Sequence, residues 1–319
     1  MGQTHCSRST GQWPLAGCAS TLPKSASELF LAPLFLRFYL ARKTGNALTN
    51  GLSQYPSGQL LIVFSLRHLD TLRLAEIDKV LPLFPPGAKI LEIGAGTGQQ
   101  ALELQRLGFD VTAIEVPVSN YAANRVYPII DYDGVHIPLP AGGFDVVFSS
   151  NVLEHVADLE NMHSEIRRVL KPAGICIHIL PTHAWRFWTT LMSYPDAALS
   201  VASAMPELLP RTKLDASEVG RLRQAWYKTI RHFVSGCLPR RHGERGNVFS
   251  ELWLFHPRWW RNNFQKNGFT VVNDQPSGLF YTGHMVLGAR LSLAQRARLA
   301  PWLGSACQIF HLKPLRSEV

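Results

Sequence analysis

Residues 89–98 constrain this chain more than any other segment, because an apolar run ends there in three closely spaced glycines. Residues 89–93 have the β-favouring character of a buried strand, and residues 99–107 have the character of a helix. Glycine tolerates the positive φ that a tight strand-to-helix turn needs, and without a Cβ it lets the backbone approach a ligand. The segment therefore predicts a strand, a turn and a helix N-terminus, the layout of a nucleotide-binding crevice.

This turn resembles the first motif of the class I S-adenosylmethionine (SAM)-dependent methyltransferases, in which an acid precedes three glycines on alternate positions. Those positions are filled by Glu92, Gly94, Gly96 and Gly98. The resemblance implies that these residues and Ala95 bind SAM. The competing dinucleotide fingerprint G-x-G-x-x-G needs its third glycine one residue later, where this chain has glutamine.

Two further acids stand where an adenosine ligand would need them. Glu115 ends a predicted strand at 110–115, about 20 residues past the turn, where a carboxylate can accept from both ribose hydroxyls. Dehydrogenases share this feature, so Glu115 indicates adenosine without saying which cofactor carries it. In the methyltransferase family an acid five residues before a proline binds the adenine amine. Asp133 has that place relative to Pro138, and the resemblance extends the contact to Gly134.

The stretch 149–156, SSNVLEHV, closely matches a segment of the type-11 branch of this family. The match implies that Asn151 lies near the methionine part of the cofactor. If the acceptor is a hydroxyl, His155 and His183 are the candidate general bases, because both follow predicted strands and histidine titrates near neutrality. No His/Asp cluster has ligand spacing along the sequence, so no metal site is expected.

The order of elements predicts an α/β fold: a Rossmann-like, doubly wound, seven-stranded sheet, mostly parallel with an antiparallel last strand. N-terminal helices and a helical lid insertion complete it, and the later strands are expected at 127–131, 175–180, 269–272 and 306–312. The link before residue 127 is too short for a crossover helix, so a loop or single turn is expected. The expected parts are a disordered tail (1–26), a helical cap (27–82), a SAM-binding core (83–182), an aromatic and basic substrate-side insertion (183–250) and the end of the sheet (251–319).

The cap is expected to hold helices at 29–42 and 66–81, the second with an apolar face of Leu69, Ile77 and Val80 and its charges, Glu76 included, elsewhere. The apolar segment 29–40 is too short to span a bilayer. Five cysteines without a C-x-x-C pair fit a reducing compartment and no structural zinc. These features predict a soluble, cytoplasmic protein with at most peripheral membrane contact.

The predicted function is SAM-dependent methyl transfer to a small-molecule or lipid-linked acceptor. The accepting atom (O, N or C) and the oligomeric state of the protein stay open. A nucleic-acid (RNA) methyltransferase is the first alternative. Much of the net charge of +9 lies in 211–245, but a solvated basic face explains it better, and no Asn/Asp-Pro-Pro-aromatic signature follows the fourth strand. A SAM-binding interaction protein without turnover is the second alternative, and the sequence leaves it open.

Overall fold

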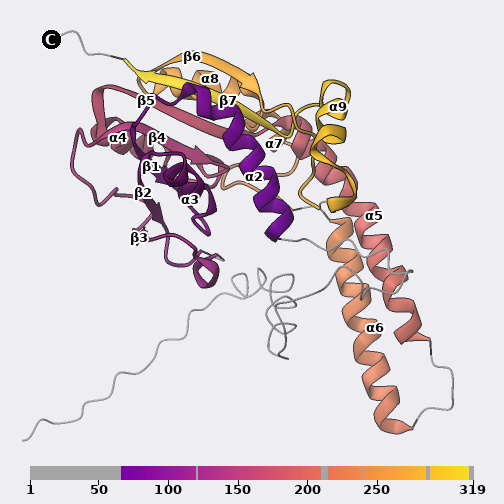
Figure 1. Ribbon diagram of the computed structural model, residues 1–319. Coiled ribbons are helices and arrows are strands. Elements are labelled where there is room, and N and C mark those ends of the chain that lie inside the picture. Colours follow the sequence, from indigo (N-terminus) through magenta and orange to yellow (C-terminus); the bar gives the residue numbers. More distant parts are fainter. Residues whose placement is uncertain (1–65, 120, 210–214, 239, 285–287, 316–319) are drawn as a thin grey trace, which may run out of the picture. The chain divides into compact units, whose positions relative to one another are not determined.

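The computed structural model describes residues 66–119, 121–209, 215–238, 240–284 and 288–315 (Figure 1). Contacts divide the chain into two units, Met1–Ser57 and Gly58–Val319, and every described residue belongs to the second. The predicted tail at 1–26 and the predicted helix at 29–42 lie outside the described residues.

A seven-stranded sheet in the order β3-β2-β1-β4-β5-β7-β6 forms the centre of the second unit (Figure 1). Strands β1 to β5 pair in parallel, whereas β7 pairs antiparallel with both β5 and β6. The predicted fold class is therefore confirmed, with β7 the strand that runs against the others. The strands are β1 (Lys89–Ile93), β2 (Asp110–Glu115), β3 (Ile129–Asp131), β4 (Phe144–Ser150), β5 (Leu170–Pro181), β6 (Phe269–Pro276) and β7 (Cys307–Pro314).

Helices cover both faces of this sheet, and the alternation of strand side chains decides which face each residue reaches. One face packs on α2, α3 and the start of α5, with a core that includes Leu72, Leu104, Ile90, Phe148, Ile177 and Trp185. The other packs on α4 and α8, with Ile166, Phe264, Leu91, Val147 and Leu180. The helices are α2 (Leu66–Val80), α3 (Gln99–Arg106), α4 (Leu159–Val169), α5 (His183–Leu208), α6 (Ala216–Cys237), α7 (Glu251–Leu254), α8 (Pro257–Lys266) and α9 (Leu293–Leu303).

Local hydrogen bonds explain where several helices begin. The side chains of Asp158 and Thr182 accept from the third backbone amide of α4 and α5, and Ser292 does so for α9. Asp215 and Glu218 form a reciprocal capping box at the start of α6. The described residues of the link before β3 contain one 3-10 turn, Ala122–Asn124, in agreement with the loop or single turn that was expected there.

Four strands differ from their predicted limits. β3 starts at Ile129 instead of 127, and β7 runs over Cys307–Pro314 instead of 306–312. The larger differences are in β5 and β6. The prediction of a fifth strand starting at 175 was wrong, because Leu170 already pairs with Phe144 and the register then shifts before Val146 pairs with Ile175. Residues 171–174 form this irregularity, whose Pro-Ala-Gly sequence reads as a turn. The sixth strand runs past its predicted end at 272 to Pro276. Its register with β7 shifts between Val271 and Asn273, and the pairing then continues to Pro276.

Glu76 corrects the prediction for α2. The charge pattern placed it off the apolar face, but the residue is fully buried. Its carboxylate accepts hydrogen bonds of 2.8 Å from both the Tyr281 hydroxyl and Arg73 Nη1. A buried acid is tolerated when such partners replace its water. Those partners include a residue about 200 positions away, which a helical period cannot reveal.

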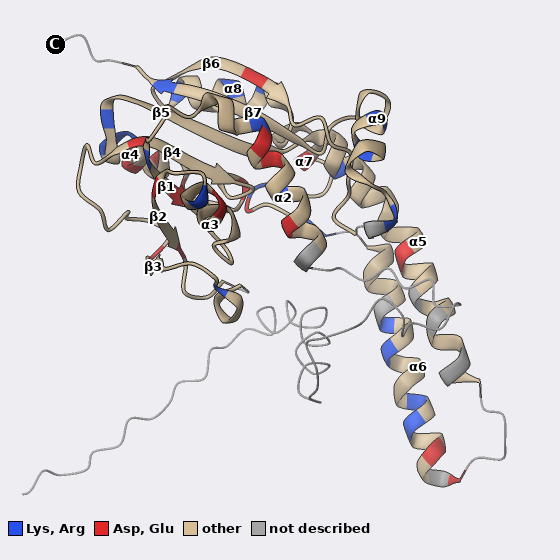
Figure 2. Ribbon diagram, viewed as in Figure 1, with Lys and Arg blue, Asp and Glu red and all other residues tan. Residues whose placement is uncertain are grey.

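The substrate-side insertion consists mainly of α5 and α6, which pack against each other; Figure 2 shows the basic residues of α6. An apolar groove of about 310 Å³ lies between them, and none of the predicted site residues lines it. Tyr227 on α6 is 64% exposed, so the aromatic residues of the insertion are not all packed in a core. That the insertion acts as a lid stays a prediction. The groove is lined by Ala198, Val201, Trp226, Thr229, Ile230 and Phe233.

Among the described helices, none has the length and hydropathy needed to cross a bilayer.

Two buried histidines make the stability of this fold sensitive to acid. His178 on β5 shares a 2.8 Å hydrogen bond with Ser149, and His163 on α4 shares one of 2.9 Å with Asn263. Burial lowers the pKa of His178 to about 3 and that of His163 to about 4, both from 6.5. Between those values and 6.5 the unfolded chain binds more protons than the folded one. Stability is therefore full above pH 6.5 and is lost as the pH falls.

We expect each of these histidines to remove about 2 kcal/mol from the free energy of unfolding between pH 7 and pH 5. Urea unfolding at both pH values measures the loss. His163→Gln removes one titrating group and should remove a comparable part of the pH dependence. A wild type and variant with the same pH dependence would contradict the assignment.

Candidate functional site

The carboxyl ends of the parallel strands bring the predicted site residues to one edge of the sheet. Ile93 at the end of β1 pairs with Ile114 on one side and Ser149 on the other. Glu115 therefore ends β2 beside the glycine turn, and Asn151 follows β4 at the same edge. This edge is where doubly wound α/β folds bind ligands.

The glycine turn has the left-handed backbone that its sequence predicts. The φ angles of Gly94, Gly96 and Gly98 are 73°, 58° and 79°. The amides of Gly94 and Ala95 both donate to the carbonyl of Ile114, at 2.9 and 3.1 Å, which fixes the turn on β2. Ala95 itself is buried.

Neighbouring side chains leave no room for a Cβ at two of these glycines. A Cβ on Gly94 would lie 2.3 Å from Val152 Cγ2, and one on Gly98 would lie 2.6 Å from Tyr127 Cβ. A Cβ on Gly96 would meet the Tyr121 ring at 3.4 Å. The glycines thus serve the packing of the protein itself as well as any ligand, a requirement that the sequence motif does not express.

Glu115 holds the turn directly. One carboxylate oxygen accepts from the amide of Gly96 at 2.7 Å, and the other accepts from the amide of Val116 at 2.8 Å. The side chain is buried, so these charge-assisted hydrogen bonds are shielded from water. Each oxygen keeps a lone pair that can accept from a ligand hydroxyl.

Glu92 lies beneath the turn with only 1% of its surface exposed. The Ala101 amide of α3 donates to its carboxylate, but Oε2 makes no hydrogen bond to any described residue. Burial, and next the charge of Glu115, raise the pKa of Glu92 to about 8. A buried oxygen without a partner fits a site that a polar ligand completes.

Asp133 organises the loop after β3. Its Oδ1 accepts from the amides of Val135 and His136, both at 2.7 Å, and Oδ2 lies 3.1 Å from His136 Nδ1. These hydrogen bonds lower the pKa of Asp133 to about 2. Gly134 makes the turn with φ of 80°. The carboxylate is largely exposed, so its contact with adenine stays a prediction.

Asn151 has a φ of 56°, the one positive value among the non-glycine residues that the structure describes. Such strain is concentrated at functional sites, and asparagine tolerates it better than most residues. Its side-chain oxygen accepts from the Cys307 thiol at 3.4 Å. Asn151 thereby joins the loop after β4 to the antiparallel strand β7.

A buried polar network behind Asn151 was missed by the sequence analysis. Cys307 Sγ lies 3.0 Å from the Tyr281 hydroxyl, which donates to Glu76. Burial raises the pKa values of both Tyr281 and Cys307. The available signal was that Arg73 and Glu76 share the helical face of Leu69 and Val80, contrary to the prediction; this spacing indicates burial of Glu76 but not its partner Tyr281.

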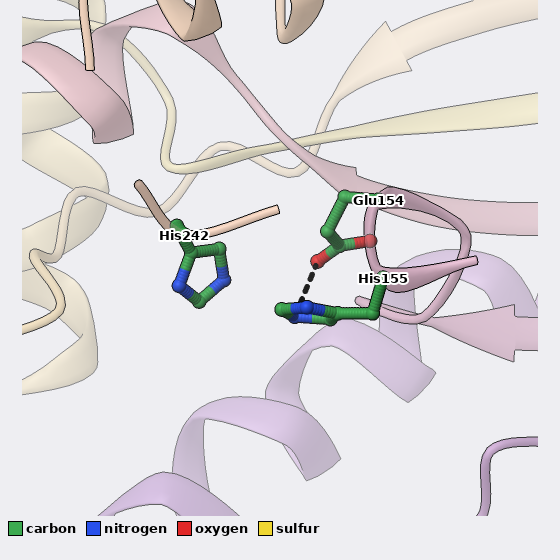
Figure 3. Close-up of side chains that lie close together, drawn as sticks. All are labelled: Glu154, His155 and His242. Atoms are coloured by element: carbon green, nitrogen blue, oxygen red, sulfur yellow. Dashed lines mark ion pairs between the residues drawn. The ribbon is translucent and has the colours of Figure 1, made fainter. Parts of the chain in front are cut away.

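The two candidate bases fall into separate clusters. His155 lies in the 3-10 turn Leu153–His155, where its Nε2 is 3.8 Å from Glu154 Oε1 and its ring centroid 4.7 Å from that of His242 (Figure 3). His183 starts α5 and stacks on His256, with 4.6 Å between ring centroids. The prediction that no cluster has ligand spacing considered sequence neighbours alone. The tertiary structure adds His242 from a distant segment.

Comparison with known proteins identifies a domain in this region. Residues 91–178 match the family model of a methyltransferase domain. This match contains the end of β1, the glycine turn, Glu115, Asp133 and Asn151.

Curated relatives match over limited parts of their length. A sterol 24-C-methyltransferase of Gibberella zeae is 33% identical over 101 residues, which cover 28% of this chain and 27% of that protein. A ubiquinone biosynthesis O-methyltransferase of Albidiferax ferrireducens is 29% identical over 159 residues, covering 46% of this chain and 58% of that protein. A crystal structure of a SAM-dependent methyltransferase from Aquifex aeolicus aligns with a TM-score of 0.40 and 14% identity, over 78% of this chain and 98% of that one.

Proposed function

We propose that this chain, whose residues 91–178 form a class I SAM-dependent methyltransferase domain of the type-11 branch, transfers a methyl group to a small-molecule or lipid-linked acceptor. The observation that carries the proposal is the pairing of Glu115 with the Gly96 amide beside the buried, unpartnered oxygen of Glu92. A turn with left-handed backbone and two acids of this kind suits the amine, ribose and methionine groups of SAM.

When bound, SAM supplies an electrophilic methyl carbon on a sulfonium, so the protein needs no covalent nucleophile. The glycine turn and Glu115 would hold the ribose and methionine portions, while Asp133 and Gly134 would hold adenine. Asn151 would position the methionine end, because it directly follows β4 and has a strained backbone. Alignment of donor and acceptor in a dry site contributes up to about 7–11 kcal/mol to such a reaction.

The acceptor class is proposed from the relatives and from the surrounding aromatics. The two relatives described above are named for sterol methylation and for ubiquinone biosynthesis. In this chain Trp185 packs on His242 at 4.6 Å between ring centroids, next to His155. A tryptophan packed beside two imidazoles suits a site for an apolar ring or lipid-linked molecule better than one for a nucleic acid. His155 is the proposed base for a hydroxyl acceptor, with His183 the alternative.

Calorimetric titration with SAM, S-adenosylhomocysteine and NAD tests the cofactor. We expect the first two to bind and NAD not to bind. Glu115→Ala should raise the Kd of SAM about 10- to 100-fold, because a hydrogen bond to a charged group contributes about 1.5–3 kcal/mol. Asp131→Ala is the matched control, since this exposed carboxylate ends the adjacent strand and pairs with Arg125 instead.

The outcomes separate the proposal from its competitors. Binding of NAD, or of no adenosine ligand at all, would overturn the methyltransferase proposal. A Glu115→Ala variant that binds SAM as tightly as Asp131→Ala would overturn the assigned role of Glu115. SAM binding followed by methyl transfer to none of a set of quinol, sterol and lipid extracts would favour an interaction protein without turnover.

A further inference from the structure

Glu154, His155 and His242 bring three potential ligand atoms together at the site edge of the sheet. One nitrogen or oxygen from each of these residues lies within 4.8 Å of the other two. Glu154 and His155 belong to the turn after β4, whereas His242 belongs to the segment between α6 and α7. Figure 3 shows the carboxylate directed at the His155 ring, with the His242 ring beside them.

The contacts of the Glu154 carboxylate within the described residues do not explain its burial. Its side chain is fully buried, and neither oxygen makes a hydrogen bond to any other described residue. Its nearest ion pair is the 3.8 Å approach to His155. Burying a carboxylate with both oxygens unpartnered is costly, so a group that binds them would explain its position.

The segment of His242 is held firmly against this turn. One oxygen of Glu251 accepts from the amides of His242 and Gly243 at 2.6 and 2.7 Å. The amide of Glu244 donates to the Glu154 carbonyl at 2.9 Å, and Arg245 donates to the Leu153 carbonyl at 3.1 Å. These contacts fix the backbone that carries His242 relative to the turn that carries Glu154 before any ligand arrives, as a binding site requires.

We propose that Glu154, His155 and His242 bind one divalent transition-metal cation, with Zn²⁺ as the best match. Two imidazoles and one carboxylate form a mixed N,O donor set that suits borderline cations, whereas Mg²⁺ and Ca²⁺ prefer oxygen alone. Three protein ligands leave at least one coordination position open.

The open position would take an oxygen of the acceptor, and this part of the inference rests on the proposed function. A hydroxyl bound to a divalent cation has a lowered pKa, so it can lose its proton to solvent, and it is held in a fixed orientation. With the cation bound, His155 would be a ligand and not the base. The cluster follows β4 only a few residues after Asn151, which places it on the acceptor side of the proposed cofactor site. A cation at this cluster would restrict the class of acceptor to molecules that carry a hydroxyl.

Titration of the full chain after treatment with a chelator tests the cation site. We expect Zn²⁺ to bind with one-to-one stoichiometry, and Co²⁺ to give the visible absorption of a low-coordinate nitrogen and oxygen site. His155→Ala, His242→Ala and Glu154→Gln should each weaken Zn²⁺ binding at least about tenfold. His155 and His242 are exposed, so their variants are expected to fold even if the buried Glu154 variant does not.

His183→Ala is the matched control, because His183 and His256 form a second close histidine pair with 4.6 Å between rings. It should bind Zn²⁺ like the wild type. Zn²⁺ affinity equal in the wild type and in both His155→Ala and His242→Ala would overturn the inference, and so would no binding of Zn²⁺. Catechol supplies hydroxyl oxygens, so adding it to the Co²⁺ form should shift the visible absorption. An unchanged spectrum would contradict the inference that a hydroxyl binds the open coordination position.

SAM titration of the same preparations keeps the two proposals separate. SAM binding without Zn²⁺ binding would overturn the cation site and leave the proposed function standing. Zn²⁺ binding without SAM binding would support the cation site and overturn the methyltransferase proposal together with the acceptor role.

Discussion

A Glu251→Ala variant is expected to lose about 3–5 kcal/mol of its free energy of unfolding, because it leaves a buried guanidinium without its counter-ion. Arg186 and Glu251 have side-chain exposures of 3% and 0% and lie 2.9 Å apart as an ion pair. Arg186 also donates to the Arg240 carbonyl at 2.7 Å. The same carboxylate binds the amides of His242 and Gly243, so the variant also releases the segment that carries His242.

Chemical denaturation measures this loss, and a neighbouring exposed pair supplies the control. Glu244 pairs with Arg241 at 3.4 Å, with about half of each side chain exposed. Glu244→Ala should therefore change stability by no more than about 1 kcal/mol. The double variant Arg186→Met with Glu251→Leu should recover part of the loss, because it leaves no unpaired charge. A Glu251→Ala variant within about 1 kcal/mol of the wild type would show that this buried pair contributes little.

Gly94→Ala is the second substitution with a large expected effect, a destabilisation of about 2–5 kcal/mol. Placing an alanine at a φ of 73° costs about 1–2 kcal/mol. The new Cβ would also lie 2.3 and 2.8 Å from the two methyl groups of Val152, and overpacking of this kind costs about 1–3 kcal/mol. Movement of Val152 would displace the turn that leads to Glu154, so SAM affinity should fall as well.

Gly87→Ala separates the two causes. Gly87 has a similar φ of 67°, but a Cβ there would meet no atom within 4 Å. Urea denaturation should show the larger loss for Gly94→Ala, and the double variant Gly94→Ala with Val152→Ala should recover the steric part. Equal losses at the two glycines would mean that backbone strain alone, without the contact to Val152, accounts for the effect.

Local sequence patterns predicted most of the sheet and the glycine turn. The limits of β1 and β2 follow from apolar runs that end in glycine or an acid, and the left-handed backbone of Gly94, Gly96 and Gly98 follows from their spacing. Such features depend on interactions within a few residues, which the order of residue types records directly. The extra length of β5 and β6 could not be predicted, because it depends on shifts of register against a partner strand.

The site divides along the same line. Glu115 was identified by its distance from the glycine turn. Glu92, Asp133 and Asn151 were identified by resemblance to methyltransferase motifs, so the sequence alone supplied these candidate cofactor residues. The tertiary structure alone decided that Glu76 is buried against Tyr281, and that His242 lies beside Glu154 and His155. Those groups are far apart along the chain, and their meeting depends on how the segment between α6 and α7 returns to the sheet. A backbone path of that kind is set by the packing of the whole unit and leaves no periodic trace in the sequence.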